Sequence, residues 1–174
     1  MTVGVLAAMR EDVAAKAQWV YGDSSRRNCF KTLFTDGTFA MLVYRLMQWS
    51  HGHQLAPLAM LFNKLNAVYG NCVIGRGASF GRRFVLIHSL GVVINTRVRG
   101  GDDIFLEHQV TIGAEKDSSP SLGNRVFVGA GAKIIGNITV GSDVKVGANA
   151  VVVHDVADGL TVVGIPAKPI STCP

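Results

Sequence analysis

A six-residue repeat of apolar side chains constrains this 174-residue chain more than any other feature of its sequence. Counting in steps of six from residue 74 to residue 152 gives fourteen positions, and thirteen of them are large and apolar. The apolar positions are Ile74, Phe80, Leu86, Val92, Val98, Ile104, Val110, Leu122, Val128, Ile134, Val140, Val146 and Val152. The exception is Lys116. A period of six matches neither a 3.6-residue helix nor the alternation of a single strand.

Such a period is typical of short flat strands joined by turns, in which each strand sends one aliphatic side chain inward. Glycine follows the apolar residue at several of these positions and permits the backbone angles of a turn. Three strands would make one triangular coil of about 18 residues, and stacked coils would lie about 4.8 Å apart. The repeat therefore predicts a parallel β-helix over residues 71–155. A β-sandwich with accidental spacing is the alternative.

The first 70 residues have a different pattern and are expected to form an α-helical segment. Apolar residues recur at helical spacing in residues 13–21 and 38–51, and residues 55–69 fit a third helix. Turns or caps are expected at Asp23-Ser24-Ser25 and Asp36-Gly37-Thr38. We expect these helices to cover the open end of the coil stack, as a solenoid requires.

Two segments are expected to depart from the stack. Lys116 lies in a polar stretch, and we expect residues 114–121 to form a loop ejected from the coils. Loops on a rigid scaffold commonly carry function. Residues 156–174 contain Pro166 and Pro169 and are expected to form an extended C-terminal tail.

Composition excludes several classes of protein. The 17 Lys and Arg exceed the 12 Asp and Glu, giving a net charge of +5. This excess fits either a mildly basic surface or a basic groove for an anionic small molecule. Nucleic acid is disfavoured, because the basic residues are not clustered with aromatic residues. No uninterrupted run of about 18 apolar residues occurs, so a membrane-spanning helix is not expected.

The three cysteines argue for a reducing environment. Cys29, Cys72 and Cys173 are odd in number and widely spaced, with no Cys-x-x-Cys pair. This pattern predicts no zinc site. The first residues also lack the basic flank of a signal peptide. We therefore expect a cytoplasmic location.

Several motifs on the repeat resemble those of a known family. They are Leu86-Ile87-His88-Ser89-Leu90-Gly91-Val92-Val93-Ile94, Val110-Thr111-Ile112-Gly113, Val128-Gly129-Ala130-Gly131-Ala132-Lys133-Ile134 and Val163-Gly164-Ile165-Pro166-Ala167-Lys168. Over about residues 30–170 the chain resembles the hexapeptide-repeat acyltransferases, and most of all their serine acetyltransferase branch. The resemblance implies a mainly β fold, namely a left-handed parallel β-helix. The left-handed winding would be an exception to the rule that connections between parallel strands are right-handed. It also implies acetyl-CoA as co-substrate, no metal, and a homotrimer with active sites between subunits.

His88 is the candidate for general base. A hydroxyl group attacks a thioester poorly until a base takes its proton, and a neutral imidazole suits that task near pH 7. A histidine hydrogen-bonded at a corner is the alternative role. His108 follows 20 residues later and should approach the same corner, either binding the acceptor or packing at an interface. Glu107 is a candidate to orient the ring of His88, and His51, His53 and His154 are expected to be surface residues.

The resemblance also assigns cofactor-binding positions. The backbone amides of Gly113 and Ala114 are candidates to hold the thioester carbonyl. Lys168, in the tail, is placed to reach the phosphates of coenzyme A. The remaining cofactor-contacting positions of the family correspond here to Ala130, Lys145 and Ala148. No cysteine lies near the site motif, so direct transfer without an acyl-enzyme is expected.

Departures from the family pattern bear on the acceptor. The serine acetyltransferases carry an Asp before the catalytic His and another beside the first rung, where this chain has Ile87 and Val73. Their Asp-Arg-His-Pro loop corresponds here to Asp117-Ser118-Ser119-Pro120. An amino-acid carboxylate left without an arginine in a closed site would cost several kcal/mol.

A neutral polyol would avoid that cost, and four polar residues are compatible with it: Asn95, Glu107, Ser118 and Ser119. With these departures the chain most resembles the serine-acetyltransferase-like enzymes that acetylate polysaccharide sugars. We therefore expect the acceptor to be a sugar of a cell-surface polysaccharide or exopolysaccharide, with L-serine as the alternative. Two other classes stay open. A γ-class carbonic anhydrase would need three histidines around zinc, and a non-catalytic trimeric scaffold would need no chemistry at all.

Overall fold

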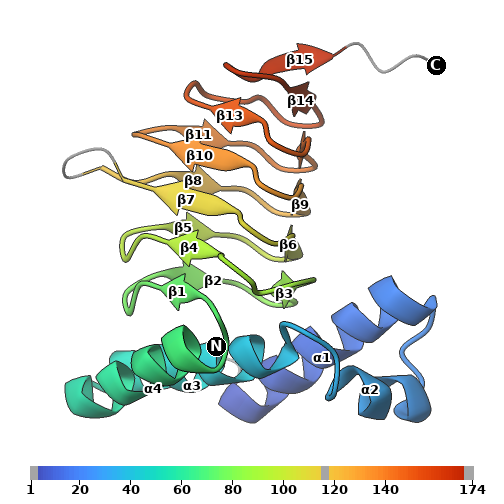
Figure 1. Cartoon of the computed structure of the whole chain (residues 1–174), viewed down its shortest axis with the longest axis vertical. Coiled ribbons are helices and arrows are strands. Elements are labelled where there is room, and N and C mark those ends of the chain that lie inside the picture. Colours follow the sequence, from blue (N-terminus) through green and yellow to red (C-terminus); the bar gives the residue numbers. More distant parts are fainter. Residues whose placement is uncertain (1–3, 115–117, 171–174) are drawn as a thin grey trace.

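The structure, a computed structural model of the whole chain, describes residues 4–114 and 118–170. Its strands form three parallel sheets that are the three faces of a triangular column (Figure 1). Face 1 contains β1 (Val73–Ile74), β4 (Val93–Ile94), β7 (Thr111–Gly113), β10 (Lys133–Ile135) and β13 (Val151–Val152). Face 2 contains β2 (Ser79–Phe80), β5 (Arg99–Gly100), β8 (Ser121–Leu122) and β11 (Thr139–Val140). Face 3 contains β3 (Val85–Leu86), β6 (Ile104–Leu106), β9 (Val126–Val128), β12 (Lys145–Val146), β14 (Thr161–Val163) and β15 (Lys168–Ile170).

The predicted parallel β-helix with a helical N-terminal segment is confirmed. Every strand pair is parallel except β14 and β15, which are antiparallel. Strand β14 pairs with β12 through Val146 and Val162, and β15 pairs with β14, so the segment expected to be an extended tail adds two strands to face 3. The expected loop at 114–121 is described only in part, because Lys116 and its two neighbours lie outside the described residues.

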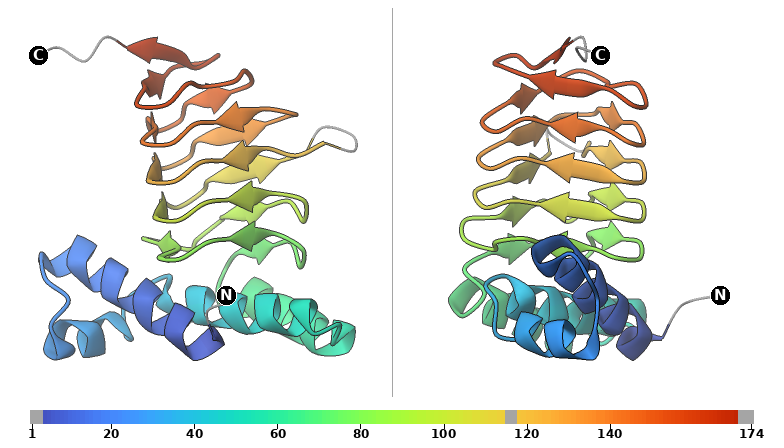
Figure 2. Two further views of the ribbon diagram at one scale, coloured as in Figure 1. Left: turned by 180° about the vertical axis from the view of Figure 1, so that it is seen from behind. Right: turned by 90° about the vertical axis from the view of Figure 1, so that its right-hand side faces the viewer.

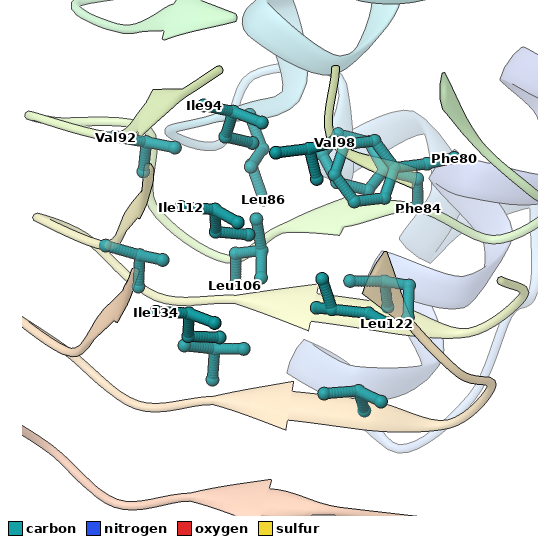
Figure 3. Close-up of a cluster of buried hydrophobic side chains, with 14 of the residues drawn as sticks. Phe80, Phe84, Leu86, Val92, Ile94, Val98, Leu106, Ile112, Leu122 and Ile134 are labelled. Atoms are coloured by element: carbon teal, nitrogen blue, oxygen red, sulfur yellow. The ribbon is translucent and has the colours of Figure 1, made fainter. Parts of the chain in front are cut away.

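The inward side chains form a narrow aliphatic core along the column (Figure 3). All thirteen apolar positions of the six-residue repeat are buried. Leu86, Leu106 and Val128 stack in register on face 3, and Ile94, Ile112 and Ile134 stack on face 1. Each coil therefore buries side chains against the coils above and below it.

The second coil is offset from the six-residue count. Its inward strand residues include Ile94 and Leu106, whereas the count selects Val92 and Ile104, two positions earlier. The offset arises after Leu86: eight positions separate Leu86 from Ile94, but only six separate their partners Leu106 and Ile112. The chain thus has two extra residues in the turn that carries His88. Both sets of aliphatic residues are buried, so the sequence pattern alone did not reveal the shift.

The helices of the described residues gather at the end of the column opposite β15, beneath and beside the first coil (Figures 1 and 2). They are α1 (Val5–Tyr21), α2 (Arg26–Thr32), α3 (Thr38–Gly52) and α4 (Ala56–Val68). Helix α2 was not expected from the sequence, and it begins after the predicted cap at Ser25, whose Oγ accepts a hydrogen bond from the Asn28 backbone N–H. No helix among the described residues is both long enough and apolar enough to cross a membrane.

Aromatic side chains close the lower end of the core. The rings of Phe80 and Phe84 stack with centroids 4.4 Å apart, and Tyr44 of α3 packs on Phe84 at 5.1 Å. The Tyr44 hydroxyl donates to the Ala78 carbonyl and accepts from the Phe80 N–H. Gly100 makes room for Phe80, because a Cβ at that glycine would lie 2.4 Å from the phenyl ring. The helical segment is therefore packed directly against the first coil.

A buried ion pair joins helix α1 to helix α3, and both of its residues also hydrogen-bond to the column. Asp12 and Arg45 are both buried, and the Arg45 Nε donates to Asp12 Oδ2 at 2.6 Å. Asp12 Oδ1 also accepts from the Phe84 backbone N–H, while Arg45 donates to the Phe80 and Gly81 carbonyls. Farther along α1, Trp19 packs on Phe105 and Phe127 of face 3. These contacts fix the position of α1 relative to the strands.

Candidate active site

His88 lies in the lengthened turn between β3 and β4, at the corner where face 3 meets face 1. We call this the His88 corner; it consists of the turns at residues 87–92, 107–110, 129–132 and 147–150. The turns are joined by backbone hydrogen bonds from Gln109 to Leu90 and from Gly131 to His108. The side chain of His88 is 51% exposed, which leaves one side of the ring open to a ligand.

His108 approaches His88 from the next coil, as its spacing predicts. The two ring centroids are 5.9 Å apart in an edge-to-face arrangement. The Glu107 carboxylate lies beside His108, with Oε2 3.6 Å from His108 Nδ1. The corner therefore brings together two imidazoles and Glu107, the one carboxylate that the sequence suggested for the site.

The carboxylate that contacts His88 is one that the sequence analysis did not propose. Asp36, in the turn before α3, places Oδ2 3.0 Å from His88 Nδ1. Its other oxygen, Oδ1, accepts a 3.4 Å hydrogen bond from Ser89 Oγ. Glu107, which the sequence suggested as the orienting group, instead lies beside His108. The sequence marked Asp36 only as part of the expected turn or cap at Asp36-Gly37-Thr38 and gave no indication of its contact with His88.

Lys16 of α1 connects the Asp36 turn to the end of β3. Its side chain is fully buried, and Nζ donates to the backbone carbonyls of Asp36 and Leu86, the latter at 2.8 Å. Burial lowers the pKa of the Lys16 ammonium to about 8, although the negative charges of Asp36 and Glu107 oppose this shift. An ammonium thus holds together the two segments that carry the histidine and its carboxylate partner.

The expected cofactor positions follow the same corner upward. Ala130 and Ala148 lie at the His88 corner in successive coils, joined by a hydrogen bond from Asn149 N–H to the Ala130 carbonyl. Lys145 is exposed on β12 of face 3, two residues before this corner. Lys168 is exposed on β15, opposite Val163 of β14. These four residues lie along one edge of the column above His88.

The remaining expected residues lie at a different corner of the same chain. Asn95, Ala114 and Ser119 lie where face 1 meets face 2, at the opposite end of the face 1 strands from His88. Ser119 Oγ donates to Asn95 Oδ1 at 3.1 Å. Ser118 directly precedes Ser119, and Gly113 is the last residue of β7, next to Ala114. A single chain therefore does not unite these residues with His88.

Other reactive side chains of the described residues are outside this corner. His53 Nδ1 lies 2.9 Å from the Trp49 carbonyl, and His51 and His154 are exposed. Burial raises the pKa of the Cys72 thiol to about 12, which makes this cysteine a poor nucleophile at neutral pH. Within residues 4–114 and 118–170, no group of three His, Cys, Asp or Glu side chains is arranged to hold a metal ion.

The coiled β column, together with the comparisons that follow, defines the class of protein: an acyltransferase of the hexapeptide-repeat type. The family model "Bacterial transferase hexapeptide (six repeats)" matches residues 119–154. The chain is similar to a serine acetyltransferase of Helicobacter pylori strain J99, with 38% identity over 167 residues that cover 94% of this chain and 92% of the relative. This chain belongs to the serine acetyltransferase family.

Two further similarities were found. A solved serine acetyltransferase structure in complex with CoA has a TM-score of 0.86 and 26% identity, and the match covers 95% of this chain and 69% of that one. A putative colanic acid biosynthesis acetyltransferase of Escherichia coli is 41% identical over 116 residues, covering 65% of this chain and 72% of the relative.

These similarities correct the expected acceptor. The sugar prediction rested on a few departures from the family pattern: the two aspartates replaced by Ile87 and Val73, and the missing arginine and histidine of one loop. The H. pylori serine acetyltransferase instead matches nearly the whole chain, while the colanic acid protein matches a shorter part. The comparisons thus contradict the sugar prediction and favour the alternative acceptor.

Proposed function

We propose that this protein is a serine O-acetyltransferase, which transfers the acetyl group of acetyl-CoA to the hydroxyl of L-serine. The observation that carries the proposal is the similarity along 94% of the chain to a protein named serine acetyltransferase. The solved relative in complex with CoA supports acetyl-CoA as the donor. The carboxylate-bound imidazole at an exposed corner supports hydroxyl activation as the chemistry.

In the proposed reaction His88 Nε2 accepts the proton of the serine hydroxyl as the oxygen attacks the thioester carbonyl. A carbon–oxygen bond forms, and the tetrahedral intermediate collapses with cleavage of the carbon–sulfur bond. The imidazolium of His88 then returns its proton to the leaving thiolate, so that free CoA and O-acetylserine are the products. The Gly113 and Ala114 amides are proposed to stabilise the negative charge on the carbonyl oxygen.

The acceptor and the donor are proposed to bind along the His88 corner. Glu107 supplies a carboxylate for the ammonium group of serine, and His108 contacts the acceptor from the second coil. Ala130 and Ala148 leave a corner without bulky side chains for the pantetheine arm, and Lys145 and Lys168 offer positive charge to the phosphates. Because Asn95, Ser119 and Ala114 lie at another corner, their participation requires a neighbouring subunit. We therefore also propose a homotrimer with active sites between subunits.

An acceptor panel tests the proposed function. The purified protein is incubated with acetyl-CoA and, separately, L-serine, D-serine, L-threonine and neutral hexoses, while free thiol is measured and the products are identified by mass spectrometry. We expect thiol release to depend on L-serine and to yield O-acetyl-L-serine. Release with another hydroxyl compound but not with L-serine would contradict the proposal, and so would the absence of release with every acceptor.

A further inference from the structure

The contact between Asp36 and His88 joins two parts of the chain that are 52 residues apart. Asp36 belongs to the helical segment, whereas His88 belongs to the first coil. Asp36 Oδ2 lies within hydrogen-bond distance of His88 Nδ1, and Oδ1 accepts from Ser89 Oγ in the same turn. One carboxylate therefore contacts two adjacent residues of the lengthened turn.

The backbone around this contact is held closely. Gly37 has φ of +78°, a left-handed conformation that favours glycine. A Cβ at Gly37 would lie 2.6 Å from the Leu86 carbonyl oxygen. Glycine thus allows the Asp36 turn to approach the end of β3, two residues before His88.

Lys16 joins the same two segments from below. Its Nζ donates to the carbonyls of Asp36 and Leu86 while the side chain is fully removed from solvent. Burying an ammonium is costly, and an apolar side chain of similar length would fill the space at lower cost. The amine therefore has a structural role: its hydrogen bonds hold the Asp36 turn against β3, the strand that leads to His88.

We propose that Asp36, held in place by Lys16, is the positioning residue for His88. Asp36 accepts the hydrogen of Nδ1–H, fixes the ring in that tautomer, and leaves Nε2 free to take a proton from the acceptor. The helical segment is therefore a part of the active site in addition to covering the end of the column. This inference rests on the proposed role of His88 as general base.

The test uses Asp36→Asn, which keeps the side-chain size but removes the charge. Asp143→Asn is the matched control, because Asp143 forms an exposed ion pair with Arg125 at a corner of the column where face 2 meets face 3. Both variants are compared with wild type by thermal melting, by steady-state kinetics, and by 15N NMR of the histidine rings. The His88 signals are assigned by their loss in His88→Ala.

We expect Asp36→Asn to melt close to wild type and to lower kcat at least about 10-fold with a smaller change in KM. The neutral ring of His88 should be protonated on Nδ1 in wild type and in Asp143→Asn, and should shift toward protonation on Nε2 in Asp36→Asn. An unchanged tautomer with an unchanged kcat in Asp36→Asn would overturn the inference. The tautomer is measured without acetyl transfer, so the positioning role can be confirmed or rejected even if the acceptor panel fails.

Discussion

Lys16 is a buried residue at this site whose packing changes the pKa of its ammonium group. It is fully buried beneath the Asp36 turn, where water cannot solvate its ammonium, and its hydrogen bonds to two backbone carbonyls replace only a part of that solvation. Desolvation is the main cause of its lowered pKa, and the charges of Asp36 and Glu107 reduce the shift without cancelling it. The folded protein therefore binds a proton at Lys16 less tightly than the unfolded chain does.

This difference predicts a pH dependence of stability. The pKa of Lys16 is about 8 in the folded protein against an ordinary value of 10.5, so between these pH values the unfolded chain carries more protons. The free energy of unfolding should then rise with pH in this window, because the cost of the buried charge disappears. Relative to that of Lys16→Met, the free energy of unfolding of wild type should rise by about 2 kcal/mol between pH 8 and pH 10.

Denaturant unfolding of both proteins across this pH range measures the effect. The comparison removes the contributions of other lysines and tyrosines, which titrate alike in the two proteins. The free energy of unfolding of wild type, minus that of Lys16→Met, should increase with pH. If this difference stayed constant or decreased, the folded protein would be keeping the Lys16 ammonium charged, against the prediction.

At the scale of secondary-structure elements, helix α1 determines how the helical segment meets the column. Lys16 and Asp12 both lie on its buried face, and Trp19 extends the contact along face 3. The ion pair between Asp12 and Arg45 is also bonded to the first coil. Asp12 accepts a hydrogen bond from the Phe84 N–H, and Arg45 donates to the Phe80 and Gly81 carbonyls. These contacts hold the helix that carries Lys16, which donates to the Asp36 carbonyl.

Removal of the Asp12 carboxylate should be strongly destabilising. In Asp12→Ala the buried Arg45 guanidinium loses its counter-charge, and we expect the free energy of unfolding to fall by about 3–5 kcal/mol. Glu11→Ala is the matched control, since Glu11 pairs with Arg82, whose side chain is 51% exposed. That exposed pair should contribute at most about 1 kcal/mol.

Chemical denaturation of the two variants provides the measurement. If Asp12→Ala lowered the free energy of unfolding no more than Glu11→Ala, the buried ion pair would not be what holds α1 against α3 and the first coil.

For the whole molecule, the sequence predicted the column because its pattern is local and repeated. The apolar residues of the six-residue count are all buried in the column, so the period itself indicates the core. The offset in the second coil was not predicted, because Val92 and Ile94 are both apolar and both buried. Helix α2 was missed because its seven residues are too few for a clear helical period.

The site was predicted less completely than the fold. The pairing of His88 with His108 follows from the coil length, and the structure places their rings together. Asp36 was identified only as a turn residue, because its contact with His88 depends on how α1 and α3 pack on the first coil. The acceptor prediction was wrong because it gave a few departures, at Val73, Ile87 and one loop, more weight than the rest of the chain, which matches a serine acetyltransferase over nearly its full length.

The central claim is that an imidazole at the corner of a coiled column acts as the base in acetyl transfer. The most direct measurement compares the rate of thiol release from acetyl-CoA in the presence of L-serine for wild type and His88→Ala. Because His88 is half exposed, its removal should leave the melting temperature nearly unchanged while the rate falls at least about 100-fold. A folded His88→Ala protein that transfers acetyl groups as fast as wild type would contradict the account.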